Sequence, residues 1–229
     1  MRVLGIVPAR GGSSRVPRKN LAVLGGRTLV RRALETALAA GCFDVVALSS
    51  EDDEILAEAD GLDVVSLRRP PELATDASRA ADFALHALRA LDDEGRPFEA
   101  VGILQCTSPF TAPEDVAGAV ALLERSGAES VVTVSRAEAA HHPLKLKRLD
   151  GDRLLPYLQD DHLTPSHELE PLWVRNGSVY VFRRDVVVER GLDAEDVRGY
   201  EMPPEHSFDI DTRRDLLFAE FLLSLEEAR

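Results

Sequence analysis

The sequence predicts an α/β fold built on a mainly parallel β-sheet. Short apolar runs rich in β-branched residues alternate along the chain with amphipathic segments of helical period. Strands that are separated by whole helices form right-handed βαβ units, whose strands run parallel. The chain has 229 residues, of which 45% are hydrophobic and 29% charged. This is enough for a single domain, residues 1–229, with a smaller inserted part.

The first half of the chain follows this alternation closely. The apolar run at residues 2–7 predicts a short buried strand, and residues 28–40 have the period of an amphipathic helix. Thr28 is the expected N-cap of that helix and Gly41 its C-terminal stop. A strand, an acidic helix, a strand and a helix are then expected, at residues 43–49, 51–60, 62–67 and 77–92.

The second half begins in the same way and then changes character. A strand, a helix and a strand are expected at residues 99–105, 113–125 and 129–135. From about 136 to 172, prolines and short apolar pieces replace the long elements, which indicates an inserted, hairpin-like lobe. A strand is again expected at 178–182. The last helix is expected at about 213–227, with Thr212 and Asp215 as a capping-box-like pair.

Composition excludes several classes of partner. The net charge of −13 argues against nucleic acid and anionic membranes. No apolar stretch approaches the roughly 18 residues of a membrane span, and the first residues lack the layout of a signal peptide. The two cysteines, Cys42 and Cys106, have no metal-binding spacing. We therefore expect a cytoplasmic protein with buried free thiols.

One segment of this acidic chain is purely basic. Residues 1–34 contain no Asp or Glu and eight basic side chains, namely Arg2, Arg10, Arg15, Arg18, Lys19, Arg27, Arg31 and Arg32. Four of them lie with a Gly-Gly pair in the loop 8–20, directly after the first strand. Glycine lets backbone N–H groups approach a phosphate closely, and Arg and Lys add charge-assisted hydrogen bonds. The alternative is a structural turn with arginines in solvent.

The loop 8–20 is neither a P-loop nor a dinucleotide-binding turn, because both of those glycine patterns are missing. In open parallel sheets, ligands bind beyond the carboxyl ends of the strands. This rule places the loop 8–20, the loop 68–78 and the loop 105–110 on one rim of the sheet. The sequence therefore predicts an anion-binding site at that rim.

A pair of aspartates near the end of the chain suggests a metal site. Asp209 and Asp211 are two residues apart, so in an extended segment their side chains point the same way. Mg²⁺ prefers oxygen ligands and takes one or two carboxylates together with phosphate oxygens and water. The alternative is a solvated strand end with Asp211 at a helix N-terminus. His141 and His142, adjacent in sequence, face opposite ways on a strand and are not expected to share a metal.

Six segments, in order, resemble the acylneuraminate cytidylyltransferase family, which includes the CMP-sialic acid synthetases. The resemblance spans residues 3–212, nearly the whole chain. The segments are VPARGGSSRVPRKN at 7–20, RPPELATD at 69–76, LQCTSP at 104–109, HHPLK at 141–145, RNGSVYV at 175–181 and DIDT at 209–212.

The resemblance implies a fold, an activity and a set of site residues. The fold is Rossmann-like, of the nucleotide-diphospho-sugar transferase type, with a small dimerisation lobe at about 136–172. The activity is transfer of CMP from CTP to a small acidic sugar, with Mg²⁺ as cofactor and pyrophosphate as the second product. A homodimer is expected. The expected catalytic residues are Arg10, Lys19 and Asp211, and the metal ligands are Asp209 and Asp211.

The implied binding residues fall into two groups. Those expected at the nucleotide are Ala9, Arg10, Gly11, Gly12, Ser13, Arg15, Lys19, Asn20, Arg69 and Ser78. Those expected at the acceptor are Gln105, Thr107, Ser108, Lys145, Arg175, Asn176 and Tyr180.

One departure from the family bears on the acceptor. Sialic acid enzymes carry an Arg-Gln pair after a proline, and this chain has Pro165-Ser166-His167 at the matching place. A serine cannot form the bidentate hydrogen bonds by which an arginine binds a carboxylate. The acceptor is thus a nonulosonic acid of the sialic type or one of several alternatives: a pseudaminic or legionaminic acid, an eight-carbon 3-deoxy-octulosonic acid, or a phosphonate. Rival classes are a nicotinamide oxidoreductase, disfavoured by the missing glycine fingerprint, and a non-catalytic nucleotide-binding protein, disfavoured by the retained Lys19 and Asp211.

Overall fold

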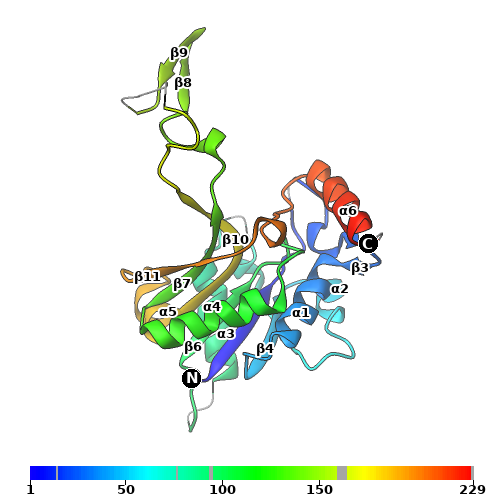
Figure 1. The fold of residues 1–229 in the computed structure, drawn as a ribbon. Coiled ribbons are helices and arrows are strands. Elements are labelled where there is room, and N and C mark those ends of the chain that lie inside the picture. Colours follow the sequence, from blue (N-terminus) through cyan, green and yellow to red (C-terminus); the bar gives the residue numbers. More distant parts are fainter. Residues whose placement is uncertain (14, 76, 93–94, 159–163, 228–229) are drawn as a thin grey trace.

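A central seven-stranded sheet organises the described part of the chain, which in this computed structural model comprises residues 1–13, 15–75, 77–92, 95–158 and 164–227 (Figure 1). The strand order is β11-β7-β10-β6-β1-β4-β5. The strands span Val3–Pro8 (β1), Val45–Ser50 (β4), Val65–Arg68 (β5), Ala100–Leu104 (β6), Ser130–Arg136 (β7), Trp173–Arg183 (β10) and Val197–Glu201 (β11).

The sheet is mainly parallel, as predicted. β1 pairs in parallel with both β4 and β6, β4 with β5, and β7 with β11. Among the described strands, β10 runs against the others and lies between β6 and β7. The carboxyl ends of β1, β4, β5 and β6 therefore meet at one edge of the sheet, where ligands bind in folds of this kind.

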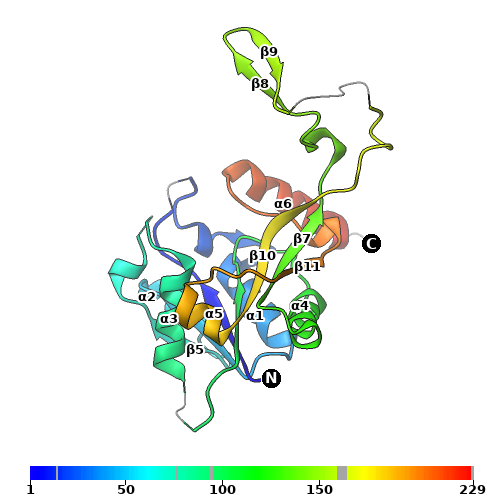
Figure 2. The same ribbon diagram turned by 90° about the vertical axis from the view of Figure 1, so that its left-hand side faces the viewer.

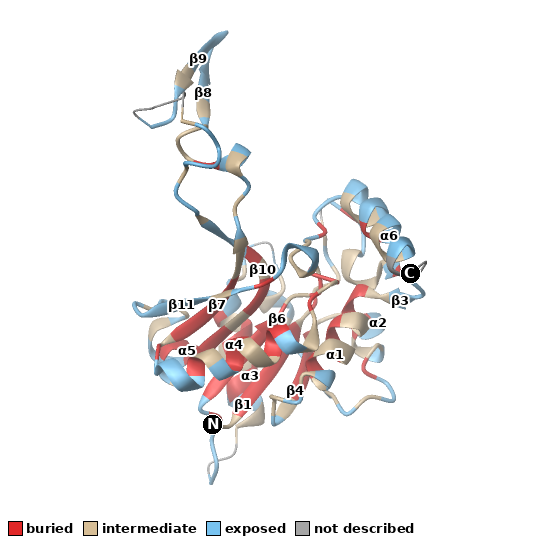
Figure 3. Ribbon diagram, viewed as in Figure 1, coloured by how far each residue is buried: buried red, intermediate tan, exposed pale blue. Residues whose placement is uncertain are grey.

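Helices cover both faces of the sheet (Figure 2). On one face α1 and α4 contact each other, with α2 and α6 beside them; the other face is covered by α3 and α5. A separate hydrophobic core fills each side, and both are continuous with the buried strands (Figure 3). The helices span Leu29–Ala39 (α1), Asp53–Ala57 (α2), Ala80–Leu91 (α3), Pro113–Ser126 (α4), Arg184–Arg190 (α5) and Arg213–Glu227 (α6).

The helix ends that were predicted from capping residues, those of α1 and the start of α6, are confirmed. Thr28 caps α1 by accepting a hydrogen bond from the Arg31 amide, and Gly41 adopts a left-handed φ of 61° just after the helix. Thr212 and Asp215 exchange hydrogen bonds of 2.7 and 3.3 Å, the reciprocal pattern of a capping box.

Several predicted bounds are wrong. The helix expected at 51–60 is only α2, because Asp52 caps it at residue 53 and turns follow it to Gly61. The strand expected at 62–67 starts at Val65. The strand expected at 178–182 is the eleven-residue β10, which pairs with β6 and β7 and so extends toward the lobe.

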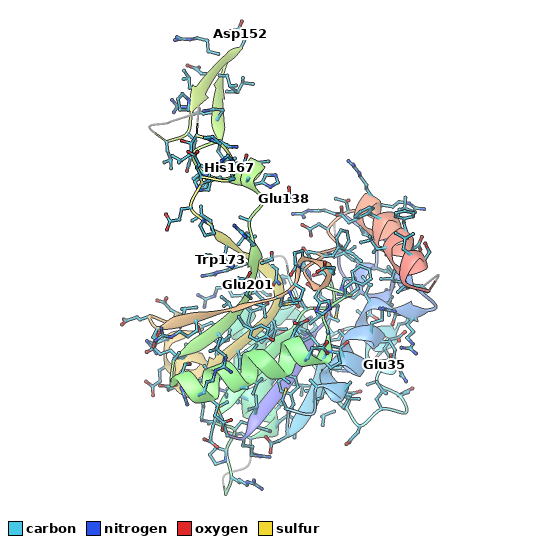
Figure 4. All side chains as sticks on the ribbon, viewed as in Figure 1. Glu35, Glu138, Asp152, His167, Trp173 and Glu201 are labelled. Carbon is cyan, nitrogen blue, oxygen red and sulfur yellow. The ribbon has the colours of Figure 1, made fainter. Side chains whose placement is uncertain are left out.

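The inserted lobe between β7 and β10 carries a two-stranded hairpin. The chain leaves the sheet after β7 and returns through the start of β10, with Arg136 and Trp173 paired in register. Between them lie the short strands β8 (Lys147–Asp150) and β9 (Arg153–Pro156). The hairpin projects away from the body, as the position of Asp152 at its tip shows (Figure 4). A second small ribbon, β2 (Val23–Leu24) with β3 (Arg27–Thr28), precedes α1.

The two cysteines are free thiols, as expected. Cys106 is buried, and burial raises its pKa to about 12. Cys42 is only partly buried, and the same effect raises its pKa to about 11. Both thiols are therefore protonated at neutral pH. None of the helices in the described residues is long and apolar enough to cross a membrane.

Two glycines on neighbouring strands create the space for an aromatic ring. Gly5 of β1 and Gly102 of β6 are register partners, and a Cβ on either would lie 2.6 or 2.5 Å from the ring of Phe43. Real Cβ atoms do not approach a ring so closely. The Phe43 ring therefore packs directly on the backbone of the two central strands, and a side chain at either glycine would displace it.

We expect Gly102→Ala to lower the free energy of unfolding by about 1–3 kcal/mol, because it overpacks this contact. Equilibrium denaturation in urea measures the change. The double variant with Phe43→Leu, which removes the ring, should lose less stability than the two single changes predict together. Strict additivity would contradict direct contact between the added methyl group and the ring.

Candidate active site

A cavity of about 370 Å³ lies beyond the carboxyl ends of the central parallel strands. The three loops predicted to share this rim all line it, so that prediction is confirmed. Eleven of the expected site residues line the cavity: Arg10, Gly12, Ser13, Arg15, Lys19, Asn20, Arg69, Ser78, Gln105, Thr107 and Asp211.

The loop 8–20 is held in place by hydrogen bonds to its backbone. The amide of Ala9 donates to the Ser49 carbonyl at 3.0 Å, and the Asn20 side chain donates to the Arg10 carbonyl at 2.9 Å. Arg18 adopts a left-handed φ of 52° and pairs with Asp52 and Glu54 outside the cavity. Arg18 is thereby turned away, and the loop keeps Arg10, Arg15 and Lys19 at the cavity.

The far end of the chain meets this loop through Asp211. One carboxylate oxygen lies 2.7 Å from Nη1 of Arg15, and the other 3.3 Å from Nζ of Lys19. The Lys19 ammonium also donates to the Ile210 carbonyl at 2.9 Å. The side chain of Ile210 is buried and its amide donates to the Thr107 carbonyl, which anchors the segment. Two groups almost 200 residues apart therefore share one cavity, as the sequence predicts.

Arg69 is a buried cation at the cavity wall. Burial lowers its pKa most, and the neighbouring charge of Arg10 lowers it further, while Glu51 acts against both. Its Nη2 lies 3.3 Å from a Glu51 oxygen, and its Nε is buried without a hydrogen-bond partner among the described residues. An anion in the cavity would offset the repulsion between the two arginines.

Asp209 and Asp211 have the donor chemistry that Mg²⁺ needs. The pKa of Asp209 is raised, and the largest cause is desolvation by the surrounding protein, although part of the residue is exposed to solvent. The charge of Asp211 raises this pKa further, whereas the hydrogen bond from Thr107 and the charge of Lys19 lower it. No group of three or more His, Cys, Asp or Glu residues able to hold a metal exists in the described part of the chain. Two carboxylates fit a cation that completes its shell with phosphate oxygens and water.

A second cavity, of about 440 Å³, adjoins the first. Gln105 lines both, so the two spaces meet at its side chain. Arg175 and Tyr180 line the second cavity, whose other walls are mostly apolar. The pKa of Tyr180 is raised chiefly by burial, with Asp209 raising it and Arg175 lowering it, so its hydroxyl lies within electrostatic reach of both. An acidic ligand held at Arg175 would therefore lie within electrostatic reach of Asp209.

Three of the expected acceptor residues line neither cavity of their own chain. Asn176 is buried and its side chain bonds Thr133 and Ser207, so it stabilises the fold. Ser108 is buried under the loop that carries it. Lys145 lies in the lobe, with Nζ hydrogen-bonded to Oγ of Ser166, and lines neither cavity. Lys145 stands between segments that line the cavities, but the order of residues in the sequence does not show that this part of the chain projects away from the sheet.

Ala9 and Gly11 contribute backbone to the loop without lining the cavity. Ala9 is buried, and the Gly11 amide already donates to Oε1 of Glu51 at 2.8 Å. A Cβ on Gly11 would lie 2.5 Å from an Asp52 carboxylate oxygen, so any larger residue there would displace the Asp52 side chain. Glu51 thus ties both Gly11 and Arg69 to the end of β4. Sequence analysis did not find Glu51; its place directly after a buried parallel strand is the signal that was available.

His206 is a second residue that sequence analysis missed. Its Nδ1 lies 2.7 Å from Oδ2 of Asp115, a buried carboxylate in the first turn of α4. His206 stands three residues before Asp209, so this contact fixes the aspartate segment to the body of the protein. Neither residue belongs to a recognisable motif, and only the fold brings them together.

Cations face the Asp211 carboxylate across one cavity, at the sheet edge where parallel folds bind nucleotides, while Asp209, two residues earlier, does not line that cavity. This arrangement suits the transfer of a nucleotidyl group, in which phosphate charge must be neutralised and the leaving group positioned. Fold and site together define a nucleotidyltransferase. Residues 4–227 match the family model described as Cytidylyltransferase, and the chain belongs to this family.

Individual relatives agree with the family assignment. The chain is 30% identical over 231 residues to the CMP-N,N′-diacetyllegionaminic acid synthase of Legionella pneumophila, covering 99% of this chain and 98% of that protein. It is 28% identical to an N-acylneuraminate cytidylyltransferase of Streptococcus agalactiae, covering 95% of this chain but only 52% of that longer protein. The solved structure of a CMP:2-keto-3-deoxy-manno-octonic acid synthetase shares the fold, with a TM-score of 0.72, 19% identity and coverage of 99% and 100% of the two chains.

We expect His206→Ala to cost about 1–2 kcal/mol of unfolding free energy, because the buried Asp115 carboxylate loses His206 as a partner and keeps the Ala112 amide. Urea denaturation measures the loss. Glu205→Ala, a change at the exposed neighbouring residue, is the matched control and should cost less than about 0.5 kcal/mol. Equal effects of the two substitutions would show that the contact does not anchor the segment.

Proposed function

We propose that this protein transfers CMP from CTP to a nonulosonic acid of the sialic or legionaminic type and releases pyrophosphate. The single observation that carries the proposal is the meeting of the loop 8–20 with Asp211 at one cavity. The family, together with relatives named for the synthesis of CMP-activated acidic sugars, supports the nucleotide and the acidic sugar. We infer that Mg²⁺ is the cofactor and that Asp209 and Asp211 hold it.

The triphosphate lies in the first cavity in this proposal. Arg10, Lys19 and Arg69 neutralise its charge, and the backbone of Gly12 and Ser13 faces it. Asp211 is paired with Arg15 and Lys19, so these cations are already held at the position proposed for the phosphates. The nucleotide therefore meets side chains that need little rearrangement, which lowers the entropic cost of ordering the site.

The acceptor lies in the second cavity. Arg175 pairs with its carboxylate, and Tyr180 and Gln105 orient its hydroxyl toward the first cavity. That hydroxyl attacks the α-phosphorus in line, a new C–O–P linkage forms, the bond from the α-phosphorus to the bridging oxygen breaks, and pyrophosphate leaves. The hydroxyl proton passes to a carboxylate or to water. When bound at the aspartates, Mg²⁺ supplies positive charge to the phosphate oxygens.

We also propose a homodimer in which the lobe completes the site. Lys145 lines neither cavity of its own chain, and the hairpin that follows it points away from them. Lys145 reaches an acceptor only if a second copy presents its lobe. The cation would then add to Arg175 in binding the carboxylate, in place of the arginine that Ser166 replaces in this chain.

A second candidate acceptor is an eight-carbon 3-deoxy-octulosonic acid. Ser166 stands where sialic acid enzymes carry an arginine, and the fold is shared with an enzyme named for an octonic acid. The two acceptor classes differ in length and in their N-acyl groups. Product mass therefore distinguishes them.

The test is pyrophosphate release from CTP with a panel of sialic, legionaminic, pseudaminic and octulosonic acids, followed by product mass. We expect release to require CTP, a nonulosonic acid and Mg²⁺, and to stop in EDTA. CTP binding without release from any acid would instead favour a non-catalytic nucleotide-binding protein. ATP, GTP and UTP serve as nucleotide controls.

We expect Lys19→Ala and Asp211→Ala each to lower kcat/KM by about 100-fold or more, because each removes charge from the reacting phosphates. The Asp211 side chain is half exposed, so its removal should change the unfolding free energy by less than about 1 kcal/mol. Lys19 is mostly buried and also loses its hydrogen bond to the Ile210 carbonyl, which should cost about 1–2 kcal/mol. Arg27→Ala is the matched control, since it removes an exposed cation of the same basic segment that pairs with Glu35. Parallel losses of stability and turnover at Asp211 would indicate a structural role.

A further inference from the structure

An unbroken run of four acidic residues, 51–54, directly follows β4. Residues 52–54 pair with Arg18 and Arg68, neither of which lines the first cavity. Glu51 differs from them, because its carboxylate contacts two groups that belong to the wall of that cavity. The run therefore contains one carboxylate whose charge is directed at the active site.

The Glu51 carboxylate bridges a backbone amide and a buried cation. Its Oε1 accepts a hydrogen bond of 2.8 Å from the amide of Gly11, and its Oε2 lies 3.3 Å from Nη2 of Arg69. Arg69 lines the first cavity, and so does Gly12, the residue after Gly11. Glu51 itself does not line it. The carboxylate therefore lies behind the wall and acts on a ligand through the groups that it holds.

Arg69 is held by more than this ion pair. Its side chain is only 5% exposed, and its guanidinium lies 5.6 Å from the centroid of the Phe83 ring. A cation is attracted to an aromatic face within about 6 Å. The Arg69 amide also donates to the Ser50 carbonyl at 2.8 Å. We therefore expect Arg69 to stay at the cavity when the charge of Glu51 is removed.

Glu51 has two opposing effects on an anionic ligand. It orders the loop 8–20 through Gly11, which favours binding, and it offsets the charge of Arg69, which opposes binding. Glutamine separates the two effects, because its amide oxygen still accepts from Gly11 while it carries no charge. Burial and the charge of Arg10 lower the pKa of Arg69, but an arginine stays protonated at neutral pH. Removing the charge of Glu51 thus leaves one more net positive charge beside the cavity.

The charge effect is the larger of the two. A phosphate that contacts Arg69 lies well within the Debye length of about 10 Å from Glu51, whose side chain is only 20% exposed. At an effective dielectric constant of about 20, two unit charges about 7 Å apart change a dissociation constant by at least about 10-fold. The hydrogen bond to Gly11 is common to Glu and Gln, so it adds little to the difference between them.

We propose that Glu51 is a positioning residue that holds Arg69 and the Gly11 amide and, through Arg69, weakens the binding of polyphosphate. The inference rests on the proposed function only in naming the ligand, which is CTP before the reaction and pyrophosphate after it. Binding that is equal in the ground state and the transition state does not speed the chemical step, and a tightly held product slows turnover. The carboxylate therefore favours the departure of pyrophosphate while it lowers the affinity for CTP.

Titration calorimetry with pyrophosphate, in EDTA so that no metal takes part, tests the inference. We expect Glu51→Gln to lower the Kd for pyrophosphate about 10-fold relative to the wild-type chain. Glu54→Gln is the matched control, because it makes the same change at a carboxylate that is 76% exposed and pairs with Arg18. Its Kd should stay within about twofold of the wild-type value. An unchanged or higher Kd in Glu51→Gln overturns the proposal.

A second variant separates the charge of Glu51 from its size. Glu51→Asp keeps the charge, so its Kd for pyrophosphate should stay within about threefold of the wild-type value. Equal changes in the Asp and Gln variants would show that packing, and not charge, sets the affinity. Thermal melting reports the affinity even of a destabilised variant, because a ligand that binds more tightly raises the melting temperature further. A smaller rise with pyrophosphate in Glu51→Gln than in the wild-type chain also overturns the proposal.

Steady-state kinetics gives a readout that a merely structural role moves differently. We expect Glu51→Gln to lower both the KM for CTP and kcat, and to make pyrophosphate a product inhibitor about 10-fold stronger. A structural role raises KM while it lowers kcat, and that result contradicts the proposal.

The inference and the proposed function fail separately in these experiments. If the wild-type chain releases no pyrophosphate from CTP but Glu51→Gln tightens pyrophosphate binding, the proposed function fails and the inference stands. If turnover is seen and the Kd does not fall, the inference alone fails. A protein that binds pyrophosphate in neither the wild-type nor the Gln form contradicts both.

Discussion

The ion-pair contact between Asp211 and the cations of the loop 8–20 is the constraint on which the site depends. It joins the first loop of the chain to the last segment before α6, across a gap in sequence of almost 200 residues. The exposed pairs contribute little stability by themselves. Their value lies in position, since the buried Ile210 and the His206–Asp115 contact hold the carboxylate in place. Charge is thus arranged before any ligand arrives.

Much of this architecture follows from local sequence patterns. The alternation of apolar runs and amphipathic helices predicts the parallel sheet, and the rule that ligands bind beyond its strands places three loops at one rim. The loop 8–20 and the aspartates are recognisable because glycines, clustered cations and paired carboxylates have few other uses. The capping roles of Thr28, Thr212 and Asp215 can also be predicted from the sequence, because capping depends on neighbours within one helical turn.

What could not be predicted depends on contacts between distant parts. The antiparallel direction of β10 is set by its pairing with β6 and β7, which the local sequence does not show. The strand β11 has too few apolar residues to be predicted from the sequence. Asn176 stands in a conspicuous motif, yet its amide stabilises the fold, because the bond that defines its role comes from Thr133, 43 residues earlier. Glu51 and His206 matter through tertiary partners for the same reason.

The place where the lobe joins the sheet has a further consequence. Arg136 and Trp173 are register partners on neighbouring antiparallel strands, so the two ends of the insertion lie only about 5 Å apart. A segment whose ends almost touch can be lengthened, shortened or exchanged while the strands on either side keep their pairing. The lobe is therefore a replaceable module. Chimeras that graft another hairpin between these two positions would test the contribution to acceptor selectivity that we propose for the lobe.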